Sequence, residues 1–406
     1  MHLVSALVVL ASVFAAYRFD ALQSQAPTTM TVDRVGPAGG PALPAQGGRV
    51  RVLTQNMFMR PPLIKNNKSD WKDARLDFFI EHILPNYQVV CLQEMFEFAS
   101  SRRSRLVAAA EKLGFRYHVL SERKFVWNAA IDGGLAILSR LPIVDAETIT
   151  YQRGIGPDWI AQKGVLYAKI AVAVAGADGA EPATTHMHLF TTHTQASYGD
   201  VFITQPDVKR RLAQMHEFHR FLEDVLPRHR APGEPVVLTG DFNVDSRAHR
   251  LSDPDRIAYE RDVEDGVQTS DEGRAMMAVL QGHGIDPKIL GPDNRDAFKG
   301  KRIIELHDTL RERLGYHPVT FGNIVVGKDG VPRPRETVLT TRGDSMVMHS
   351  IDYVLWHNPE PEPSAAGVRA SVADVAVTPN LTPQQPFSQI SDHYGVTAEI
   401  GFERAA

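Results

Sequence analysis

Five short polar clusters, each directly after an apolar β run, carry the residue types in this sequence that can do chemistry. They are Gln55-Asn56, Gln93-Glu94, Thr192-His193-Thr194, Gly240-Asp241-Phe242-Asn243 and Ser391-Asp392-His393. A polar group at the end of a buried strand costs free energy unless it is paired. One such cluster alone is better explained by a turn or a helix cap. Because carboxylate, amide and imidazole groups recur five times in this setting, we expect them to converge on one charged ligand or metal ion.

The side chains in these clusters also indicate which metal. Carboxylate and amide oxygens without thiolates suit a hard divalent cation such as Mg²⁺. Zinc is the weaker candidate, because His193 and His393 are far apart in the sequence and no HExxH-like spacing accompanies them. A hard cation together with two imidazoles fits hydrolysis of a phosphate ester. The metal neutralises charge on the phosphate, and a histidine near its ordinary pKa of about 6.5 can take a proton from water.

The rest of the chain must position these clusters, and its hydrophobic pattern alternates between β and α periods. The apolar runs predict strands over 50–55, 88–93, 135–138, 164–174, 188–192, 236–238 and 351–356, and helical spacing predicts helices near 71–78, 101–113 and 207–226. Several strands follow one another without an intervening helix. We therefore expect an α+β fold with mixed or antiparallel sheets covered by helices, not a doubly wound parallel sheet. The charged stretch 250–300 indicates a helical or loop insertion in the same domain.

The composition excludes several classes of protein. The 406 residues include 30 Gly and 26 Pro, too few for a low-complexity or collagen-like chain. The formal net charge of −4 provides no overall positive field for sequence-independent binding of nucleic acid. The single cysteine, Cys91, excludes an intrachain disulfide and cysteine-based zinc sites.

The N-terminal segment 1–26 predicts a signal peptide. Its uncharged apolar run, 3–16, is shorter than the about 20 residues that a membrane-spanning helix needs, and it suits the hydrophobic region of a leader. We expect export, to the periplasm or the medium, with an uncleaved N-terminal membrane anchor as the alternative. Residues 27–48 are rich in Pro, Gly and small side chains, which is typical of a linker. Residues 49–406 then form the single catalytic domain.

The motifs, taken in their order, resemble those of the endonuclease/exonuclease/phosphatase superfamily of DNase I-like, metal-dependent phosphoesterases. The motifs that carry this resemblance are GDFN (240–243), IDYV (351–354) and SDH (391–393). Within that superfamily the chain is similar to the neutral sphingomyelinases, through LTQNMF (53–58), GGLAILSRLPI (133–143), DWIAQKGVLYAKI (158–170) and THTQASY (192–198). The resemblance covers roughly 49–402. It implies a four-layer αββα sandwich of two mixed β-sheets flanked by helices.

The resemblance also implies a role for each motif residue. Glu94 is implied as the principal metal ligand with Asn56 beside it, and Asp392 as part of the metal shell or of the layer around it. His393 is implied as the general base, oriented by Asp352. The remaining implied site residues position water, hold the phosphate, stabilise its charge or approach it: Asp241, Asn243, His193 and the pair Asp158 and Lys163.

Each implied role has a plainer alternative. Asp241 and Asn243 could form an Asx-type turn, and Asp352 could be a structural partner of a backbone amide. Lys163, directly before a strand, could be an exposed cation. Trp159 and Ile160 lie between Asp158 and Lys163 in the sequence, and they either contact a bilayer at the mouth of the site or are buried.

The activity implied by the resemblance is hydrolysis of sphingomyelin to ceramide and phosphocholine. Mg²⁺ is the expected cofactor, with Mn²⁺ or Co²⁺ as substitutes. The expected partner is a phospholipid bilayer surface, on which we expect the protein to act as a monomer. A nuclease or a soluble phosphate-ester phosphatase is the alternative, although the net charge argues mildly against DNA. A third alternative is a binding module without activity. The stretch 325–341 corresponds to a membrane-inserting hairpin of some bacterial sphingomyelinases but has no aromatic residue, which argues against insertion by that device.

Overall fold

The structure is a computed structural model of the whole chain. It describes residues 28–29, 33–34, 48–62, 64, 67, 69–122, 131–176, 181–197, 205–248, 266–290, 297–357 and 363–405. The predicted leader 1–26 lies outside the described residues, as does most of the predicted linker 27–48. Among the helices in the described part of the chain, none is both long and apolar enough to cross a membrane.

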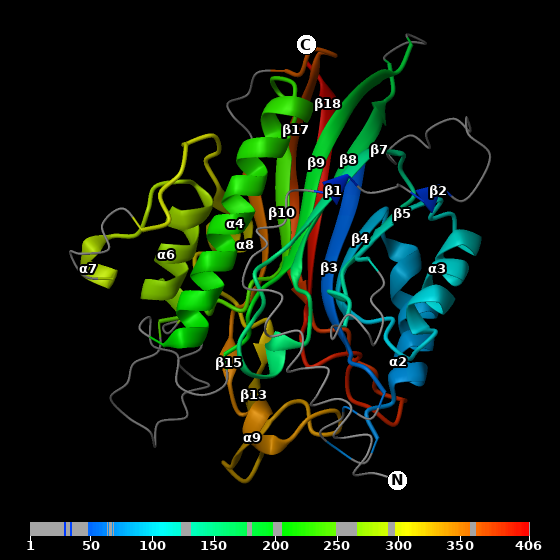
Figure 1. Ribbon diagram of the computed structural model, residues 1–406. Helices are drawn as coiled ribbons and strands as arrows, with labels where there is room; N and C mark the ends of the chain where they lie inside the picture. Colours follow the sequence, from blue (N-terminus) through cyan, green and yellow to red (C-terminus); the bar gives the residue numbers. More distant parts are fainter. Residues whose placement is uncertain are drawn as a thin grey trace.

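Two large sheets form the centre of the molecule (Figure 1). The first has the strand order β1 (Thr28–Thr29), β7 (Ile143–Thr150), β8 (Gly164–Val174), β9 (Ala183–His193), β10 (Val236–Asp241), β16 (Asp352–His357) and β11 (His307–Asp308). The second has the order β17 (Val368–Thr378), β18 (Gly395–Arg404), β3 (Arg49–Met59), β4 (Val89–Met95), β6 (Ala136–Ser139), β5 (Tyr117–Leu120) and β2 (Asp33–Arg34). Both sheets are mixed, because one pair of strands in each is parallel.

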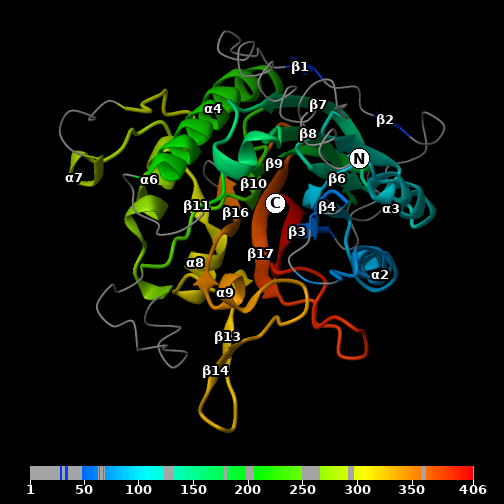
Figure 2. The same ribbon diagram turned by 60° about the horizontal axis from the view of Figure 1, so that its bottom comes forward.

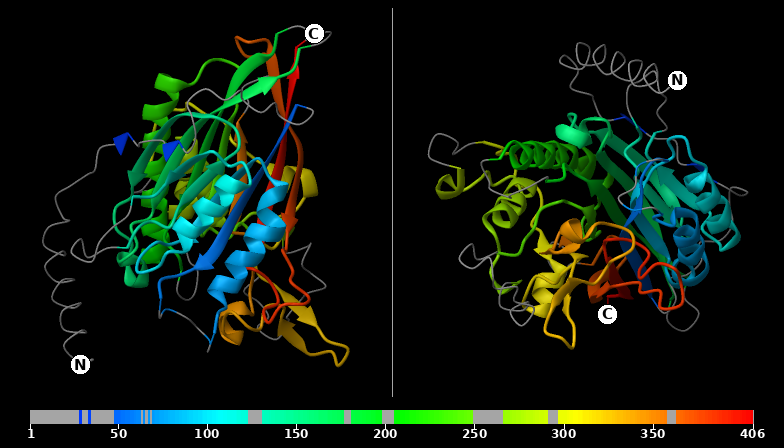
Figure 3. Two further views of the ribbon diagram at one scale, coloured as in Figure 1. Left: turned by 90° about the vertical axis from the view of Figure 1, so that its right-hand side faces the viewer. Right: turned by 90° about the horizontal axis from the view of Figure 1, so that it is seen from below.

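Alternating side chains explain why the sheets pack on each other and on helices. In β4, Val89 and Cys91 join the apolar core between the two sheets, whereas Val90 and Leu92 join a second core on the opposite face. That second core is covered by α2 (Lys72–Phe78), the π-helix η2 (Phe79–Ile83), the 3₁₀ turn η3 (Leu84–Asn86) and α3 (Arg102–Lys112). A third core lies under α4 (Pro206–His229) and α6 (Asp271–Leu280). The layers are therefore α, β, β, α, with α3 and α4 on opposite outer faces (Figures 1 and 3).

Each parallel pair has a helical crossover, as the geometry of parallel strands requires. The segment with α2 and η2 connects β3 to β4, and α4 connects β9 to β10. The carboxyl ends of these four strands consequently lie at one end of the sandwich. Four of the polar clusters identified in the sequence follow or close these strands.

Smaller elements complete the fold. They are η5 (Gly156–Trp159), α7 (Pro287–Leu290), α8 (Thr309–Leu314), α9 (Arg342–Ser345), the pair β12 (Phe321–Gly322) with β15 (Met348–His349), and the hairpin of β13 (Ile324–Val326) with β14 (Pro332–Pro334). Figure 2 shows the hairpin projecting from the rest of the molecule.

The predicted fold class is confirmed: the chain is an α+β, four-layer sandwich of two mixed sheets. All seven predicted strands and all three predicted helices are present, with shifted ends except for β8, whose predicted bounds are those observed. The sequence analysis did not predict β5, β7, β17 or β18. The predicted insertion 250–300 contains α6 and α7 in its described parts.

Candidate active site

Strand register brings three of the predicted site residues side by side. Asp241, the last residue of β10, pairs with His193 of β9 on one side and with Asp352 of β16 on the other. Gly240 allows this close pairing. Its φ is +133°, and a Cβ there would lie 2.1 Å from the carbonyl oxygen of Thr192. The glycine of the GDFN motif is therefore required by the approach of β9.

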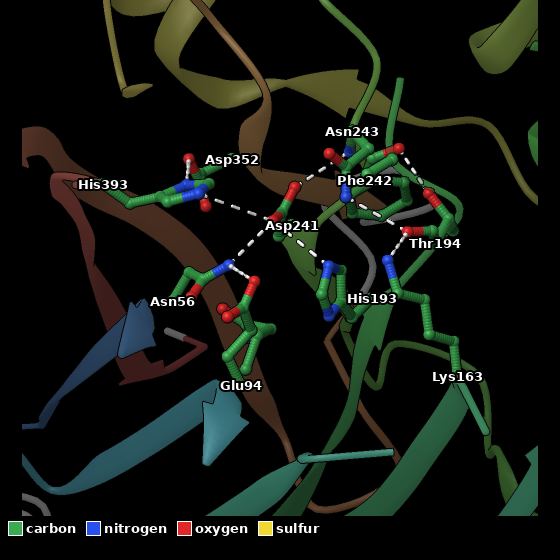
Figure 4. A network of polar contacts seen from close by, with 12 residues as sticks. Asn56, Glu94, Lys163, His193, Thr194, Asp241, Phe242, Asn243, Asp352 and His393 are labelled. Carbon is green, nitrogen blue, oxygen red and sulfur yellow. Dashed lines mark hydrogen bonds and ion pairs between the residues drawn. The ribbon is translucent and has the colours of Figure 1, made fainter. Parts of the chain in front are cut away.

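Asp241 is the centre of the resulting network (Figure 4). Its side chain is fully buried. Oδ2 accepts a hydrogen bond from Asn56 Nδ2 at 2.9 Å and lies 3.5 Å from His193 Nε2 and 3.8 Å from His393 Nε2. Oδ1 accepts from the backbone N–H of Asn243 at 2.9 Å, which is an Asx-type turn. This geometry is thus compatible with both alternatives for Asp241 and Asn243, an Asx-type turn and a role in the site.

His393 and Asp352 form a buried acid–imidazole dyad. The Nδ1 of His393 lies 2.9 Å from Asp352 Oδ2, which fixes the ring and leaves Nε2 directed toward Asp241. Burial disfavours a charge on His393, but Asp352 and Asp241 outweigh it and raise the pKa of the imidazole. Burial also raises the pKa of Asp352, whose second oxygen, Oδ1, has no hydrogen-bond partner among the described residues.

A group of acidic and amide side chains lies next to this dyad. Asn56 Nδ2 also donates to Glu94 Oε1, at 3.3 Å, so the two residues that close β3 and β4 are in contact. Burial and the neighbouring charge of Asp392 raise the pKa of Glu94, and burial raises that of Asp392. Within the described ranges Glu94 Oε2 is buried without a hydrogen-bond partner. Burial is the main cause of both shifts, and the positive charges of Arg60 and His393 act against it without cancelling it.

This excess of acceptors fits a hard divalent cation. Two carboxylates close enough to raise a pKa, one with an unsatisfied buried oxygen, match the oxygen-rich shell that Mg²⁺ prefers. A second combination, Asp241, Asp352 and His393, has ligand atoms within 4.8 Å of one another. There, however, His393 Nδ1 and Asp352 Oδ2 are already paired with each other, and only Asp352 Oδ1 has no hydrogen-bond partner among the described residues. The Asn56 side chain presents its nitrogen to Glu94, and its Oδ1 accepts from the N–H of Phe58 at 3.0 Å.

His193 is a neutral imidazole in this setting. Burial, together with the positive charge of Lys163, lowers the pKa of His193 to about 3. Its Nδ1 is buried, with no partner in the described part of the chain. A hydrogen-bonding group that carries no charge therefore lies at the end of β9 without a partner for its Nδ1 among the described residues.

Lys163 and Asp158 form a buried pair on the other side of His193. Lys163 is only 4% exposed, so its interpretation as an exposed cation is wrong. Its Nζ donates to Asp158 Oδ2 at 2.7 Å and to the carbonyl oxygen of Thr194 at 2.6 Å. The same carbonyl accepts from Asn243 Nδ2 at 3.1 Å. The Thr194 carbonyl thus connects the ammonium of Lys163 to the GDFN turn, a contact that no sequence pattern indicates.

The ten predicted site residues are consequently gathered at one end of the sandwich. They form three connected parts, which are the acidic group, the dyad, and Lys163 with its partners. The ten residues are Asn56, Glu94, Asp158, Lys163, His193, Asp241, Asn243, Asp352, Asp392 and His393. Phe321, which the sequence analysis did not single out, packs on His393 with ring centroids 4.8 Å apart. Its position depends on β12, a two-residue strand that no periodicity reveals.

The residues considered for bilayer contact differ in exposure. Ile160 is 42% exposed, whereas Trp159 is half-buried under the guanidinium of Arg153, 4.8 Å from its ring centroid. The β13–β14 hairpin lies within the stretch that was compared with a membrane-inserting hairpin. Its Val325 and Val331 are 39% and 42% exposed.

The sequence and the fold both have known relatives. Residues 53–393 match the model of the endonuclease/exonuclease/phosphatase family. A sphingomyelinase of Dictyostelium discoideum is 31% identical over 475 aligned positions, covering 86% of this chain and 98% of that protein.

Two solved structures show the same fold. Sphingomyelinase C from Streptomyces griseocarneus superposes with a TM-score of 0.51 and 22% identity, over 86% of this chain and 99% of that one. A mutant of beta toxin from Staphylococcus aureus, solved with bound magnesium ions, superposes with a TM-score of 0.50 and 17% identity, over 88% and 99% of the two chains.

Proposed function

Because this chain belongs to the endonuclease/exonuclease/phosphatase family, we propose that it is a divalent-metal-dependent phosphodiesterase that hydrolyses sphingomyelin to ceramide and phosphocholine. The observation that carries the proposal is the joint placement of Glu94, the His393–Asp352 dyad and Lys163 around Asp241. The similarity to a sphingomyelinase over almost the whole of both chains supports the substrate.

Glu94 and Asp392 hold the cation, and Asn56 lies beside them. The preferred cation is Mg²⁺, with Mn²⁺ or Co²⁺ as substitutes, because carboxylate and amide oxygens without thiolates favour hard ions. The beta toxin relative, solved with magnesium ions, supports the same choice. When bound, the cation neutralises charge on the phosphoryl oxygens as a Lewis acid.

His393 is the general base. Its Nδ1 is occupied by Asp352, so Nε2 is the atom that would take a proton from water. Without a cation, burial opposes a charge on His393, but Asp352 and Asp241 outweigh burial and raise the pKa of His393 to about 10, so the imidazole would act as a base only once a bound cation offsets that negative charge. The water oxygen attacks phosphorus and the bond from phosphorus to the ceramide oxygen breaks. That oxygen takes a proton from solvent water, and the proton held by His393 returns to solvent. The products are ceramide and phosphocholine. Asp241, 3.8 Å from Nε2, orients the water and favours the protonated imidazole that forms.

The phosphate is held from the other side of Asp241. Asn243 and Lys163, which share the Thr194 carbonyl, provide an amide and a positive charge toward the phosphoryl oxygens. Asp158 keeps the ammonium of Lys163 in place. His193 contacts the phosphoryl or leaving oxygen through Nδ1 and, being neutral, adds no charge that competes with the cation.

The enzyme acts as a monomer on the surface of a bilayer after export. The apolar run 3–16 supports export, or alternatively anchoring by the same segment. The exposed side chains of Ile160, Val325 and Val331 support contact with lipid near the site. None of the three is aromatic, so shallow adsorption fits them better than deep insertion.

Liposome hydrolysis tests the proposal. Purified protein is incubated with vesicles of sphingomyelin or phosphatidylcholine, and separately with plasmid DNA, each with Mg²⁺ or with EDTA. We expect phosphocholine release from sphingomyelin in Mg²⁺ and none in EDTA. Efficient cutting of plasmid DNA without any phosphocholine release would show that the substrate is a nucleic acid.

A further inference from the structure

Glu94 has an unusual backbone conformation that needs an explanation. Its φ is +53°, in the left-handed region, where a residue with a side chain costs about 1–3 kcal/mol unless its surroundings impose it. On one side the β4–β6 ladder ends at Leu92, and on the other the β3–β4 ladder is irregular here, pairing Gln93 with Asn56 and then Met95 with Met59, so Glu94 itself has no regular strand pairing. Within the described ranges its carboxylate accepts one hydrogen bond, from Asn56 Nδ2 at 3.3 Å, and its Oε2 has no partner. The position of the Glu94 carboxylate must therefore be fixed largely through its backbone.

The DGG sequence at 132–134 provides that support. Directly after the kink, the N–H of Met95 donates to the carbonyl of Gly134 at 2.8 Å. Gly134 has a φ of +65°, and a Cβ there would lie 3.1 Å from Glu94 Cα and 2.9 Å from the Phe96 ring. The two backbones are thus in direct contact, and only glycine permits it.

Asp132 accepts hydrogen bonds from both backbone segments, at Gly134 and at Glu97. Its Oδ1 accepts from the N–H of Gly134 at 2.8 Å, and its Oδ2 accepts from the N–H of Glu97 at 3.0 Å. One carboxylate therefore connects the segment just after the kink, at Glu97, to Gly134, which itself bonds to Met95. Asp132 is 1% exposed.

Arg103 of α3 compensates the buried charge. Its Nη1 donates to Asp132 Oδ1 at 3.2 Å, and its Nε lies 3.4 Å from Glu97 Oε2. Glu97 also accepts from the hydroxyl of Ser104 at 2.6 Å. The support is thus anchored to the first turn of a helix that packs on the sheet.

We propose that Asp132 is a positioning residue that preorganises Glu94 for the metal ion, and this inference rests on the proposed metal-dependent function. The carboxylate acts through the backbones of Gly134 and Glu97 and does not itself touch metal or substrate. Residues that orient metal ligands typically change metal affinity by about 10–100-fold when they are replaced. The consequence expected here is a weaker metal site in a protein that remains folded.

Two variants of Asp132 and a matched control test this role. Asp132→Ala removes both backbone acceptors. Asp132→Asn keeps one acceptor oxygen and serves as the milder variant should the alanine variant fail to fold. The control is Glu234→Ala. Glu234 is likewise a buried carboxylate, 5% exposed, that accepts a backbone N–H, from Ala231 at 2.8 Å, but it contacts β9 at His186 and His188, away from Glu94.

Isothermal titration of Mn²⁺ into EDTA-treated protein is the direct measurement, with thermal unfolding to record folding. We expect the Kd for Mn²⁺ to rise about 10–100-fold in Asp132→Ala, less in Asp132→Asn, and not in Glu234→Ala despite its lower Tm. Turnover lost by Asp132→Ala at low Mg²⁺ is expected to be largely recovered at high Mg²⁺.

Unchanged Mn²⁺ affinity in folded Asp132 variants, or equal weakening in Glu234→Ala, would overturn the positioning role. Wild-type protein that binds no Mn²⁺ would instead refute the proposed metal-dependent function. The two failures are therefore distinguishable.

Discussion

Strand β9 carries two buried histidines whose surroundings differ sharply. His188, in the middle of the strand, uses both ring nitrogens: Nδ1 lies 2.9 Å from the hydroxyl of Tyr167, and Nε2 lies 2.9 Å from Glu234 Oε2. The other oxygen of Glu234 lies 2.7 Å from His186 Nδ1. His193, at the end of the strand, has a buried Nδ1 with no partner in the described ranges and lies 3.5 Å from its carboxylate, Asp241.

The carboxylates of the two regions differ in the same way. Burial opposes the ionisation of Glu234, but His186 and His188 outweigh it and lower the pKa of that carboxyl. Around Glu94, burial and Asp392 act together and raise the pKa. The residue types are similar, so residue type alone does not identify a site. Buried polar groups are normally satisfied within the protein. A ligand is therefore expected at Glu94, whose charge the protein compensates incompletely.

Removing an imidazole from each region gives the largest expected contrast. His393→Ala should lower kcat by about 10²–10⁴-fold, the usual contribution of a general base. The Tm should change little, because burial raises the pKa of Asp352 and lets that carboxyl bind a proton once the imidazole is gone. His188→Ala should keep substantial activity but unfold at a lower temperature, because it leaves Glu234 buried with one partner fewer. Phosphocholine release and calorimetric unfolding of both variants measure this. A large loss of Tm in His393→Ala would instead indicate a structural role for the dyad.

Lys163 tests the phosphate side of the pocket. Lys163→Met keeps most of the side-chain volume but leaves Asp158 buried without its cation, so we expect a loss of stability of about 3–5 kcal/mol as well as a loss of activity. In the double variant Lys163→Met/Asp158→Asn the stability should largely return while the activity does not. Urea denaturation together with kcat/KM separates the two effects. Recovery of activity along with stability would mean that Lys163 only holds the loop.

Neutralising one acid in each region should change stability in opposite directions. In metal-free protein, Glu94→Gln removes an incompletely compensated buried charge and should raise stability by about 1 kcal/mol. Glu234→Gln removes the partner of two histidines and should lower stability by about 1–3 kcal/mol. Thermal unfolding in EDTA checks both signs. A destabilised Glu94→Gln protein would show that Glu94 is satisfied by the fold itself.

The pH dependence of stability should reveal the neutral His193. Its pKa falls from the ordinary value of 6.5 to about 3 on folding. The associated stability is therefore complete above pH 6.5 and is lost as the pH falls from 6.5 toward 3, because only the unfolded chain takes up the proton. The loss is at most roughly 1.4 kcal/mol per pH unit in that window. Thermal unfolding of wild type and His193→Asn between pH 7 and pH 5 should show a shallower slope for the variant, and equal slopes would contradict the assignment.

The sequence predicted the elements that carry the site better than it predicted the sheet edges. The run 164–174 is almost continuously apolar, which predicts a buried strand, and β8 has the predicted bounds. By contrast, β17 is an edge strand whose alternation of buried and exposed positions is broken by a β-bulge between Val372 and Asp374, so Val368–Thr378 contains no continuous apolar run. Edge strands need fewer buried side chains than central strands, and local patterns detect them poorly.

The candidate site was predictable in its residues but not in its contacts. The polar clusters were recognisable because they follow buried strands. The burial of Lys163 and its contact with the Thr194 carbonyl depend on how β8 and β9 pair, as does the neutral state of His193. The left-handed backbone of Glu94 is equally a product of tertiary contacts. Such properties arise between segments distant in sequence, where hydrophobic periodicity carries no information.

The central claim is that the incompletely compensated acids near the dyad form a divalent-cation site. Equilibrium titration of Mg²⁺ into EDTA-treated wild type and Glu94→Gln tests this most directly. Our account predicts saturable binding that raises the Tm of wild type, and at least tenfold weaker binding in Glu94→Gln. Equal Mg²⁺ affinity in the two proteins would contradict it.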